Sequence, residues 1–395
     1  MATNQFMIIA GEPSGDALAA DLVNSLARQW PAGLRPHIFG LGGEKLKAAG
    51  VELLEDMTQH TVFGLSEALK KYFLFKRIFD RAIDAARQRL PDLIILVDFG
   101  GFNLRFAKAI RALSAQGRSP FSNWRPRIVY FVPPQVWASR PKRARTISEC
   151  IDLVVSIFPF ERDWYSERYP SLDLRYVGDP MASRFNSSLD DRPTRKPPPP
   201  SAPLKVALLP GSRRQEISRH LPLLVEAIKL IQKHRPCEAT IVSPSKDLLS
   251  EYRHLGGKDF QWQVGGLAHL LQESDVAIAS SGTVTRECAY QRIPTVVVYQ
   301  VSRLTYEIGK RVITVPFIAM PNLLAGKRVY PELIQDAATP TAIAQETLQL
   351  CQPNDFQALM QDLERVVLSL GPPGATDRAA AEILEKFSIQ AEPSC

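Results

Sequence analysis

Residues 275–287 read Asp-Val-Ala-Ile-Ala-Ser-Ser-Gly-Thr-Val-Thr-Arg-Glu, an apolar strand that passes through a turn of small residues into a helix. In a parallel sheet this turn lies at the carboxyl edge, where backbone N–H groups and the positive end of the helix dipole face an anion. Ser281, Gly282 and Thr283 form the cradle, and Glu287 follows within reach of a ribose. The pattern predicts a nucleotide site; the alternative is that Ser-Gly-Thr only caps the helix.

A similar unit lies upstream. The strand 205–209 breaks at Pro-Gly-Ser-Arg before an amphipathic helix over 217–233. Gly211 allows a sharp turn, Ser212 follows it, and the planar guanidinium of Arg213 can hold a diphosphate bidentately. Two strand ends that offer donors to an anion favour the nucleotide interpretation over a simple helix cap.

Length and composition indicate a globular chain. Its 395 residues, 45% hydrophobic and 23% charged, suggest two domains. The net charge of +7 favours a phosphorylated ligand, an anionic membrane surface or a polyanion, and we expect no nucleic acid partner. No segment approaches the roughly 20 apolar residues of a membrane span, so we expect a cytoplasmic protein. Five scattered cysteines and six histidines lack ligand spacing, so no disulfide, metal or other cofactor is predicted.

Apolar runs alternate with helical patterns along most of the chain, which favours parallel β-α-β units with helices on both faces. The Pro-rich run 190–203 predicts a linker. The predicted fold is α/β, with two doubly wound Rossmann-like domains that face each other across a cleft. We expect these domains at 1–189 and 204–338. The helices of 339–395 would cross back to the first domain or pack on a partner subunit.

Two strand ends in the first domain carry acidic residues. One is the turn Gly-Glu-Pro-Ser-Gly-Asp at 11–16, which differs from the Gly-x-Gly-x-x-Gly dinucleotide pattern. Its Glu12 suits a sugar hydroxyl or amine, Ser14 can cap the next helix, and Gly15 allows close approach of backbone to ligand.

The other strand end is Asp98, which follows the apolar run 93–97. A carboxylate at the edge of a cleft can act as a general base, although Asp98 could also cap the following helix. Asn103, at the opening of that helix, is placed to orient a substrate hydroxyl.

A series of motifs, in order along most of the chain, carries a resemblance to one enzyme family. The motifs are Ala-Gly-Glu-Pro-Ser-Gly-Asp at 10–16, Phe-Gly-Leu-Gly-Gly at 39–43, Phe-Asn-Leu at 102–104, Val-Trp-Ala at 136–138, Pro-Phe-Glu at 159–161, Leu-Leu-Pro-Gly-Ser-Arg at 208–213, Ser-Gly-Thr at 281–283 with Glu287, Met-Pro-Asn-Leu-Leu-Ala-Gly at 320–326 and Pro-Glu-Leu-Ile-Gln at 331–335. Together they resemble the motifs of lipid-A-disaccharide synthases.

The resemblance implies a metal-independent, inverting glycosyltransferase of the two-Rossmann type (glycosyltransferase B). Such enzymes move 2,3-diacylglucosamine from UDP-diacylglucosamine to the 6-hydroxyl of 2,3-diacylglucosamine 1-phosphate. The products are the β-1,6 disaccharide of lipid A and UDP.

The resemblance also implies roles for the residues above. Arg213 and the turn at 281–283 would hold the diphosphate, and Glu287 would accept hydrogen bonds from the ribose. Asp98 would be the general base, with Glu12 positioning the sugars. Two further residues would add donors near the diphosphate or donor sugar: Asn322 and Gln335.

The chain departs from the family pattern in the acceptor-side domain. The family usually has Asp-x-Pro-Asp-Phe-Asn where 98–103 read Asp-Phe-Gly-Gly-Phe-Asn, so Gly101 replaces a carboxylate. Ser139 and Asp179 replace the usual Trp and His of two other motifs. The alternatives are another UDP-sugar enzyme on this scaffold, such as a UDP-N-acetylglucosamine 2-epimerase, or a non-catalytic UDP-sugar-binding membrane protein.

The segment 69–79 combines apolar and basic residues at helical spacing. Tyr72, Phe75 and Phe79 form a stripe typical of a core-facing helix. Acylated substrates imply peripheral association with the inner leaflet of the bacterial inner membrane, and the alternatives for this helix are burial on two sides or a homodimer contact. The predicted membrane-contact residues are those outside the stripe: Phe73, Leu74, Ile78, Lys70 and Arg77.

Overall fold

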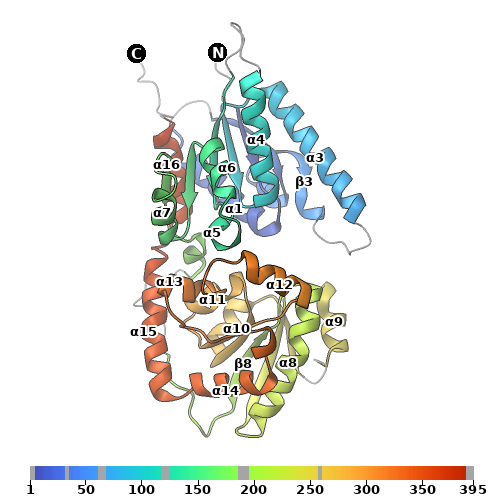
Figure 1. Ribbon diagram of the computed structural model, residues 1–395, viewed down its shortest axis with the longest axis vertical. Coiled ribbons are helices and arrows are strands. Elements are labelled where there is room, and N and C mark those ends of the chain that lie inside the picture. The colour runs from blue at the N-terminus through green and yellow to red at the C-terminus, as the bar shows by residue number, and fades with distance from the viewer. Residues whose placement is uncertain are drawn as a thin grey trace. The chain divides into compact units, whose positions relative to one another are not determined.

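The computed structural model describes residues 5–31, 35–60, 68–116, 124–185, 195–256 and 260–387, without the side chains of residues 59, 60 and 68–71. The chain divides into two compact units (Figure 1). The first comprises Met1–Ser183 and Gly371–Cys395, and the second comprises Arg184–Leu370. Each unit has its own sheet and its own hydrophobic core.

Within the described residues, the first unit is built on a seven-stranded sheet in the order β3-β2-β1-β4-β5-β6-β7. All neighbouring strands pair in parallel. The central strand β4 is buried along its whole length, as expected of a parallel strand covered on both faces. The strands are β1 (Gln5–Ile9), β2 (His37–Gly42), β3 (Glu52–Asp56), β4 (Leu93–Val97), β5 (Arg127–Phe131), β6 (Leu153–Ser156) and β7 (Leu174–Tyr176).

Helices cover both faces of this sheet. The final helix, α16 (Ala375–Lys386), packs on α1 (Pro13–Gln29), where Arg28 forms an ion pair with Asp377 at 2.6 Å. The last helix therefore returns to the first unit, as predicted. The other helices are α2 (Glu44–Ala48), the 3₁₀ helix η1 (Met57–His60), α3 (Ala68–Arg89), α4 (Gly100–Gln116), α5 (Val136–Ser139), α6 (Arg143–Cys150), α7 (Pro159–Ser166) and η3 (Pro180–Phe185).

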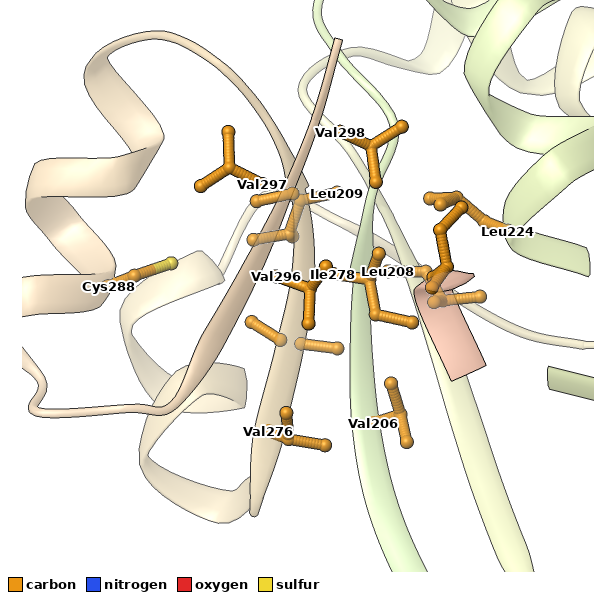
Figure 2. Close-up of a cluster of buried hydrophobic side chains, with 14 of the residues drawn as sticks. Val206, Leu208, Leu209, Leu224, Val276, Ile278, Cys288, Val296, Val297 and Val298 are labelled. Carbon is orange, nitrogen blue, oxygen red and sulfur yellow. The ribbon is translucent and has the colours of Figure 1, made fainter. Parts of the chain in front are cut away.

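The second unit contains, among the described residues, a six-stranded parallel sheet in the order β10-β9-β8-β11-β12-β13. Figure 2 shows Leu208, Ile278 and Val296 from its three neighbouring central strands, and all three side chains are fully buried. The strands are β8 (Leu204–Leu209), β9 (Cys237–Ser243), β10 (Gln261–Val264), β11 (Val276–Ser280), β12 (Thr295–Tyr299) and β13 (Glu332–Ile334).

The helices of the second unit include two that the sequence placed with the first domain. These are α14 (Pro340–Leu350) and α15 (Pro353–Ser369), so of the three helices described after residue 339 only α16 returns to the first unit. Two doubly wound parallel α/β folds are nonetheless confirmed. The remaining helices are α8 (Arg214–Gln232), η5 (Lys246–Leu248), α9 (Leu249–His254), α10 (Leu267–Glu273), α11 (Thr283–Tyr290), α12 (Arg303–Val312), α13 (Met320–Ala325) and η7 (Gln335–Ala337).

The described part of the predicted linker, 195–203, is attached to the second unit. The Arg195 guanidinium donates to the backbone carbonyls of Leu271 (2.5 Å), Ser274 (2.7 Å) and Gln291 (2.8 Å). Each of these bonds involves a charged donor and is stronger than a bond between neutral groups. Residues 190–194 of the predicted linker lie outside the described residues.

The apolar stripe of α3 differs from the predicted one. Ile78, predicted to contact the membrane, is only 2% exposed, whereas Tyr72, predicted to face the core, is 60% exposed. The helix phase is set further along, where Phe79 packs edge-on against Phe102 and Phe106 of α4. This packing brings Ile78 inward, so its assignment to the membrane face is wrong.

Other predicted membrane residues do lie outward. Phe73 is 59% exposed and its ring meets that of Tyr72 edge-on at 5.6 Å. Leu74 is half-buried and Arg77 is exposed, while the side chain of Lys70 lies outside the described residues. No helix in the described ranges is long and apolar enough to span a bilayer.

Glu161 is a carboxylic acid buried in the first unit. The indole Nε1–H of Trp137 donates to its Oε1 at 2.8 Å. Burial raises the pKa of Glu161 from 4.5 to about 7, because a buried carboxylate loses the hydration that stabilises its charge. The folded chain therefore holds this proton at a pH where the unfolded chain has released it.

We expect Glu161→Gln to stabilise the protein in a pH-dependent way. As pH rises from 4.5 to about 7, the wild type loses stability because ionisation is harder in the folded state. The variant cannot ionise, so its melting temperature should exceed that of the wild type by a few degrees at pH 8. The difference should shrink steadily toward pH 4.5. Thermal melts across this range test the prediction, and a difference independent of pH would contradict it.

Candidate active site

The strand β4 ends in a strained turn that carries Asp98. Asp98 and Phe99 both have left-handed backbone, with φ of +48° and +52°. Such conformations are uncommon outside glycine and concentrate at functional sites. Two groups hold the turn by donating to the Asp98 carbonyl at 2.8 Å, the Asn103 amide and the Tyr130 hydroxyl. Asp98 is thereby fixed at the carboxyl edge of the sheet, where α/β folds bind ligands.

Asn103 does not have the predicted role. Its side chain is fully buried, and its amide nitrogen also approaches the carbonyl of Val97 at 3.3 Å. A substrate hydroxyl cannot reach this amide without displacing the core. Asn103 instead holds the backbone from which Asp98 projects.

Phe99 packs directly on the turn between β1 and α1. A Cβ added to Gly11 would lie 2.2 Å from Cγ of the Phe99 ring, so only glycine fits there. The same ring stacks on Phe102 at 5.2 Å and meets Phe75 of α3 at 6.2 Å. The turn that carries Glu12 and the strand end that carries Asp98 are therefore packed together.

The turn after β1 presents its predicted polar residues to solvent. Glu12 is the N-cap residue of α1, but its carboxylate caps no backbone N–H, and both Glu12 and Ser14 are exposed. Gly15 is buried beside the base candidate, because a Cβ added there would lie 3.7 Å from Cβ of Asp98. Glu12, Ser14, Gly15 and Asp98 thus belong to one edge of the first sheet.

In the second unit, α11 begins without a side-chain cap. Gly282 is the N-cap residue with φ of +149°, and Gly282 and Thr283 are exposed. The Ser281 hydroxyl donates to the carbonyl of Ile318 at 3.0 Å rather than capping the helix. Glu287 lies half-buried on the same helix. The first turn therefore keeps the polarity that attracts an anion.

The first turn of α8, which follows the loop after β8, carries a carboxylate that the sequence reasoning missed. Glu216 accepts from the backbone N–H of Ser212 at 3.0 Å and from the Arg213 guanidinium at 2.9 Å. Gly211 turns the chain into this loop with φ of +128°. A Glu three residues after the N-cap residue is the sequence signature of a capping carboxylate, and it could have identified Glu216.

His220 is a second residue that the sequence did not reveal. The backbone N–H of Gln300 donates to its Nε2 at 2.9 Å, so Nδ1 carries the proton and donates to the Pro210 carbonyl at 2.8 Å. Burial lowers the pKa of His220, which favours this neutral form. The ring joins the ends of β8 and β12. A single histidine on an amphipathic helix gives no sequence indication of such a role.

Asn322 does not offer donors to a ligand. It is fully buried, and its amide donates to the Tyr330 carbonyl and to Glu332, both at 2.8 Å. Its oxygen accepts from the backbone N–H groups of Val329 and Tyr330. Glu332 also accepts from the N–H of Ile318. Asn322 therefore braces the segment that receives the Ser281 hydroxyl, and its predicted contact with the donor is wrong.

Gln335 likewise uses its side chain within the protein. Its amide oxygen accepts from the N–H of Val301 at 3.0 Å, and its amide nitrogen donates to the Val301 carbonyl at 2.8 Å. Its backbone is left-handed, with φ of +56°. Both amide atoms bond the backbone of Val301, so Gln335 fixes the loop that leads into α12.

The three departures from the family pattern have different surroundings. Gly101 is exposed, and a Cβ added there would meet nothing within 4 Å. Ser139 is half-buried, and Asp179 is buried and accepts from the N–H of Met181 at 3.1 Å.

In the ranges that the structure describes, no group of three His, Cys, Asp or Glu side chains could hold a metal ion.

Comparison with solved structures supports the fold. The chain matches a UDP-N-acetylglucosamine 2-epimerase, described as putative, from Listeria monocytogenes with a TM-score of 0.61 and 13% identity, covering 100% of this chain and 99% of that one. It matches the calicheamicin glycosyltransferase with a TM-score of 0.57 and 14% identity, covering 98% and 99%. These identities are low, so the similarity concerns the fold alone.

Sequence comparison extends to the family. A lipid-A-disaccharide synthase from Myxococcus xanthus is 37% identical, with 96% of this chain and 97% of the relative covered. The synthase from Syntrophus aciditrophicus is 36% identical, with 96% of each chain covered. A family model described as lipid-A-disaccharide synthetase matches residues 6–385. With nearly its whole length matched, the chain belongs to the lipid-A-disaccharide synthetase family.

Proposed function

We propose that this protein is a hexosyltransferase that moves 2,3-diacylglucosamine from UDP to the 6-hydroxyl of 2,3-diacylglucosamine 1-phosphate. The products are the β-1,6 lipid A disaccharide 1-phosphate and UDP. The family match over residues 6–385 is the observation that carries the proposal. The two strand-end sites, one acidic and one suited to an anion, supply groups that this reaction requires.

Asp98 is the proposed general base. It takes the proton of the acceptor 6-hydroxyl while that oxygen attacks the anomeric carbon of the donor, and the bond from that carbon to UDP breaks with inversion. The rigid turn at Asp98 and Phe99 suits this role, because proton transfer depends on accurate placement of the base. Exposed Glu12 is the proposed group that positions the sugar hydroxyls.

The second unit would stabilise the leaving UDP. Arg213 and the uncapped start of α11 are the proposed diphosphate contacts, and Glu287 is the proposed ribose contact. The Arg213–Glu216 ion pair is mostly exposed on the Arg213 side, so it contributes little stability. Arg213 can exchange this carboxylate for a diphosphate, while Glu216 retains the Ser212 N–H.

We also propose that the exposed start of α3 contacts the inner leaflet of the bacterial inner membrane. Tyr72 and Phe73 present aromatic rings outward beside the exposed Arg77, a combination suited to an anionic bilayer surface. Peripheral attachment would bring the enzyme to its acylated substrates. A homodimer through the same residues is the competing use of this surface.

Substitution of Asp98 and Arg213 should separate chemistry from nucleotide binding. We expect Asp98→Asn to lower turnover by about 10²- to 10⁴-fold while UDP affinity stays near wild type.

Arg213→Ala should weaken UDP binding, whereas the neighbouring Arg214→Ala, which loses an exposed pair with Glu251, should not. UDP release and disaccharide mass measure turnover, and calorimetry measures UDP affinity. Release of UDP without disaccharide by the wild type would reject the proposed acceptor, and an active Asp98→Asn would reject the base.

A methyl group on Gly11 should disturb the site through packing. We expect Gly11→Ala to displace the Phe99 ring and lower turnover about tenfold or more, since small misplacements of catalytic groups are costly. Gly101→Ala is the matched control, because its added methyl group meets nothing within 4 Å. Initial rates with the two diacyl substrates test this, and equal rates for the two variants would contradict the packing argument.

Loss of the aromatic pair on α3 should weaken membrane attachment. We expect Tyr72→Ser combined with Phe73→Ser to reduce co-sedimentation with anionic vesicles, because two exposed rings no longer enter the interface. Leu90→Ser, just beyond the other end of α3, removes an exposed apolar side chain and serves as the control. If the double variant pelleted like the wild type but no longer formed a dimer, the homodimer alternative would replace the membrane proposal.

A further inference from the structure

The helix α12 of the second unit turns its apolar stripe toward solvent. Leu304, Ile308 and Val312 follow one another at helical spacing and are 73%, 55% and 43% exposed. No residue of α12 is buried. A surface helix normally turns this stripe toward the core. Within the second unit, the apolar face of α12 is therefore unpartnered.

The rest of the α12 surface carries an excess of positive charge. α12 carries three cations, Arg303, Lys310 and Arg311, against the single carboxylate of Glu307, and all four residues are exposed. The Lys310 ammonium lies 5.4 Å from the ring centroid of Tyr306, and by helical spacing both residues lie on the side of the helix opposite the apolar stripe. An apolar stripe on one side of a helix, with cations on its polar side, is typical of helices that lie in the interface of an anionic bilayer.

The start of α12 is firmly attached to the sheet. The Ser302 hydroxyl caps the helix by accepting from the N–H of Thr305 at 3.2 Å, and the Gln335 amide makes both of its bonds to the backbone of Val301. This loop follows the carboxyl end of β12 in a parallel sheet, the same edge that carries the loops after β8 and β11. The exposed apolar face is thus held at the edge of the proposed UDP site.

We propose that α12 is an interfacial helix that lies on an anionic lipid bilayer. Leu304, Ile308 and Val312 would enter the boundary between headgroups and acyl chains, and the three cations would contact lipid phosphates. This contact is additional to that of α3, which belongs to the first unit. The inference rests on the proposed function for its purpose, because the nucleotide-linked donor also carries acyl chains, but the binding itself requires no substrate.

The size of the patch argues against a second copy of the chain as its occupant. Stable protein interfaces bury about 800 Å² on each partner, or roughly 20–30 residues a side. α12 has 10 residues, and three side chains form its apolar stripe. A bilayer needs no matching surface and can accept a single helix.

Vesicle binding by the full chain tests the proposal. We expect Leu304→Ser combined with Ile308→Ser to lower the partition coefficient about fivefold on vesicles of phosphatidylglycerol and phosphatidylethanolamine. Leu368→Ser is the matched control, since Leu368 of α15 is 56% exposed but lies outside this helix. Equal partitioning of the double variant and the control would overturn the proposal.

A fluorescent probe on the helix reports insertion directly. In a chain with Cys237→Ser and Cys395→Ser, Ile308→Cys labelled with an environment-sensitive dye should shift its emission to the blue on anionic vesicles. The same dye at Leu368→Cys should not respond. An absent shift at position 308 while the chain pellets would overturn the proposal. A blue shift that appears without vesicles and grows with protein concentration would also overturn the proposal, because it would indicate self-association through α12.

Turnover separates this inference from the proposed function. With substrates dispersed in detergent, the Leu304→Ser, Ile308→Ser variant should match the wild type, and with substrates in anionic vesicles it should be slower. A wild type that forms no disaccharide in detergent would reject the proposed function, and the vesicle and dye measurements would still decide the role of α12. Equal rates of variant and wild type on vesicles would count against that role.

Discussion

The strained backbone at Asp98 and Phe99 depends on hydrogen bonds to a single carbonyl oxygen. Each left-handed residue costs about 1–3 kcal/mol, and the bonds donated by Asn103 and Tyr130 to the Asp98 carbonyl offset this cost. With the backbone held in this way, the Phe99 ring closes over Gly11 and meets Phe75 of α3. The proposed base, the Glu12 turn and the proposed membrane helix are therefore joined through one aromatic side chain.

The second unit uses the same principle with different residues. Buried Asn322 uses all of its amide hydrogen-bonding groups within the protein, and half-buried Gln335 bonds the backbone of Val301. His220 joins the ends of β8 and β12. Exposed residues of the loops at the carboxyl edge of this sheet, such as Thr283 and Arg213, remain able to approach an anion. Polar residues at these strand ends thus divide into those that brace the loops and those that meet solvent. Loops braced in this way favour ligand binding, because binding then costs little conformational entropy.

Sequence predicted the fold better than the site, for a physical reason. Parallel strands covered on both faces read as continuous apolar runs, so the central strands of both sheets could be predicted. The edge strands β3, β10 and β13 are only partly buried and carry no such run, so the sequence does not reveal them. Whether a polar residue after a strand faces solvent depends on distant packing, which is why Asn103 and Asn322 were assigned to substrates. Asp16 shows the same limit: its carboxylate caps the start of α2 by accepting from Gly43 at 2.7 Å, 27 residues away. Ile78 was misplaced because partners on α4 set the phase of α3.

Two basic helices with exposed apolar side chains, one in each unit, contribute to the net charge of +7. Each helix exposes only a few apolar residues, so either alone would bind a bilayer weakly and reversibly. Because α3 and α12 belong to one chain, attachment of the first would raise the effective concentration of the second at the membrane. Each of the two proposed contacts would be reversible, so neither would fix its unit permanently at the membrane when product leaves.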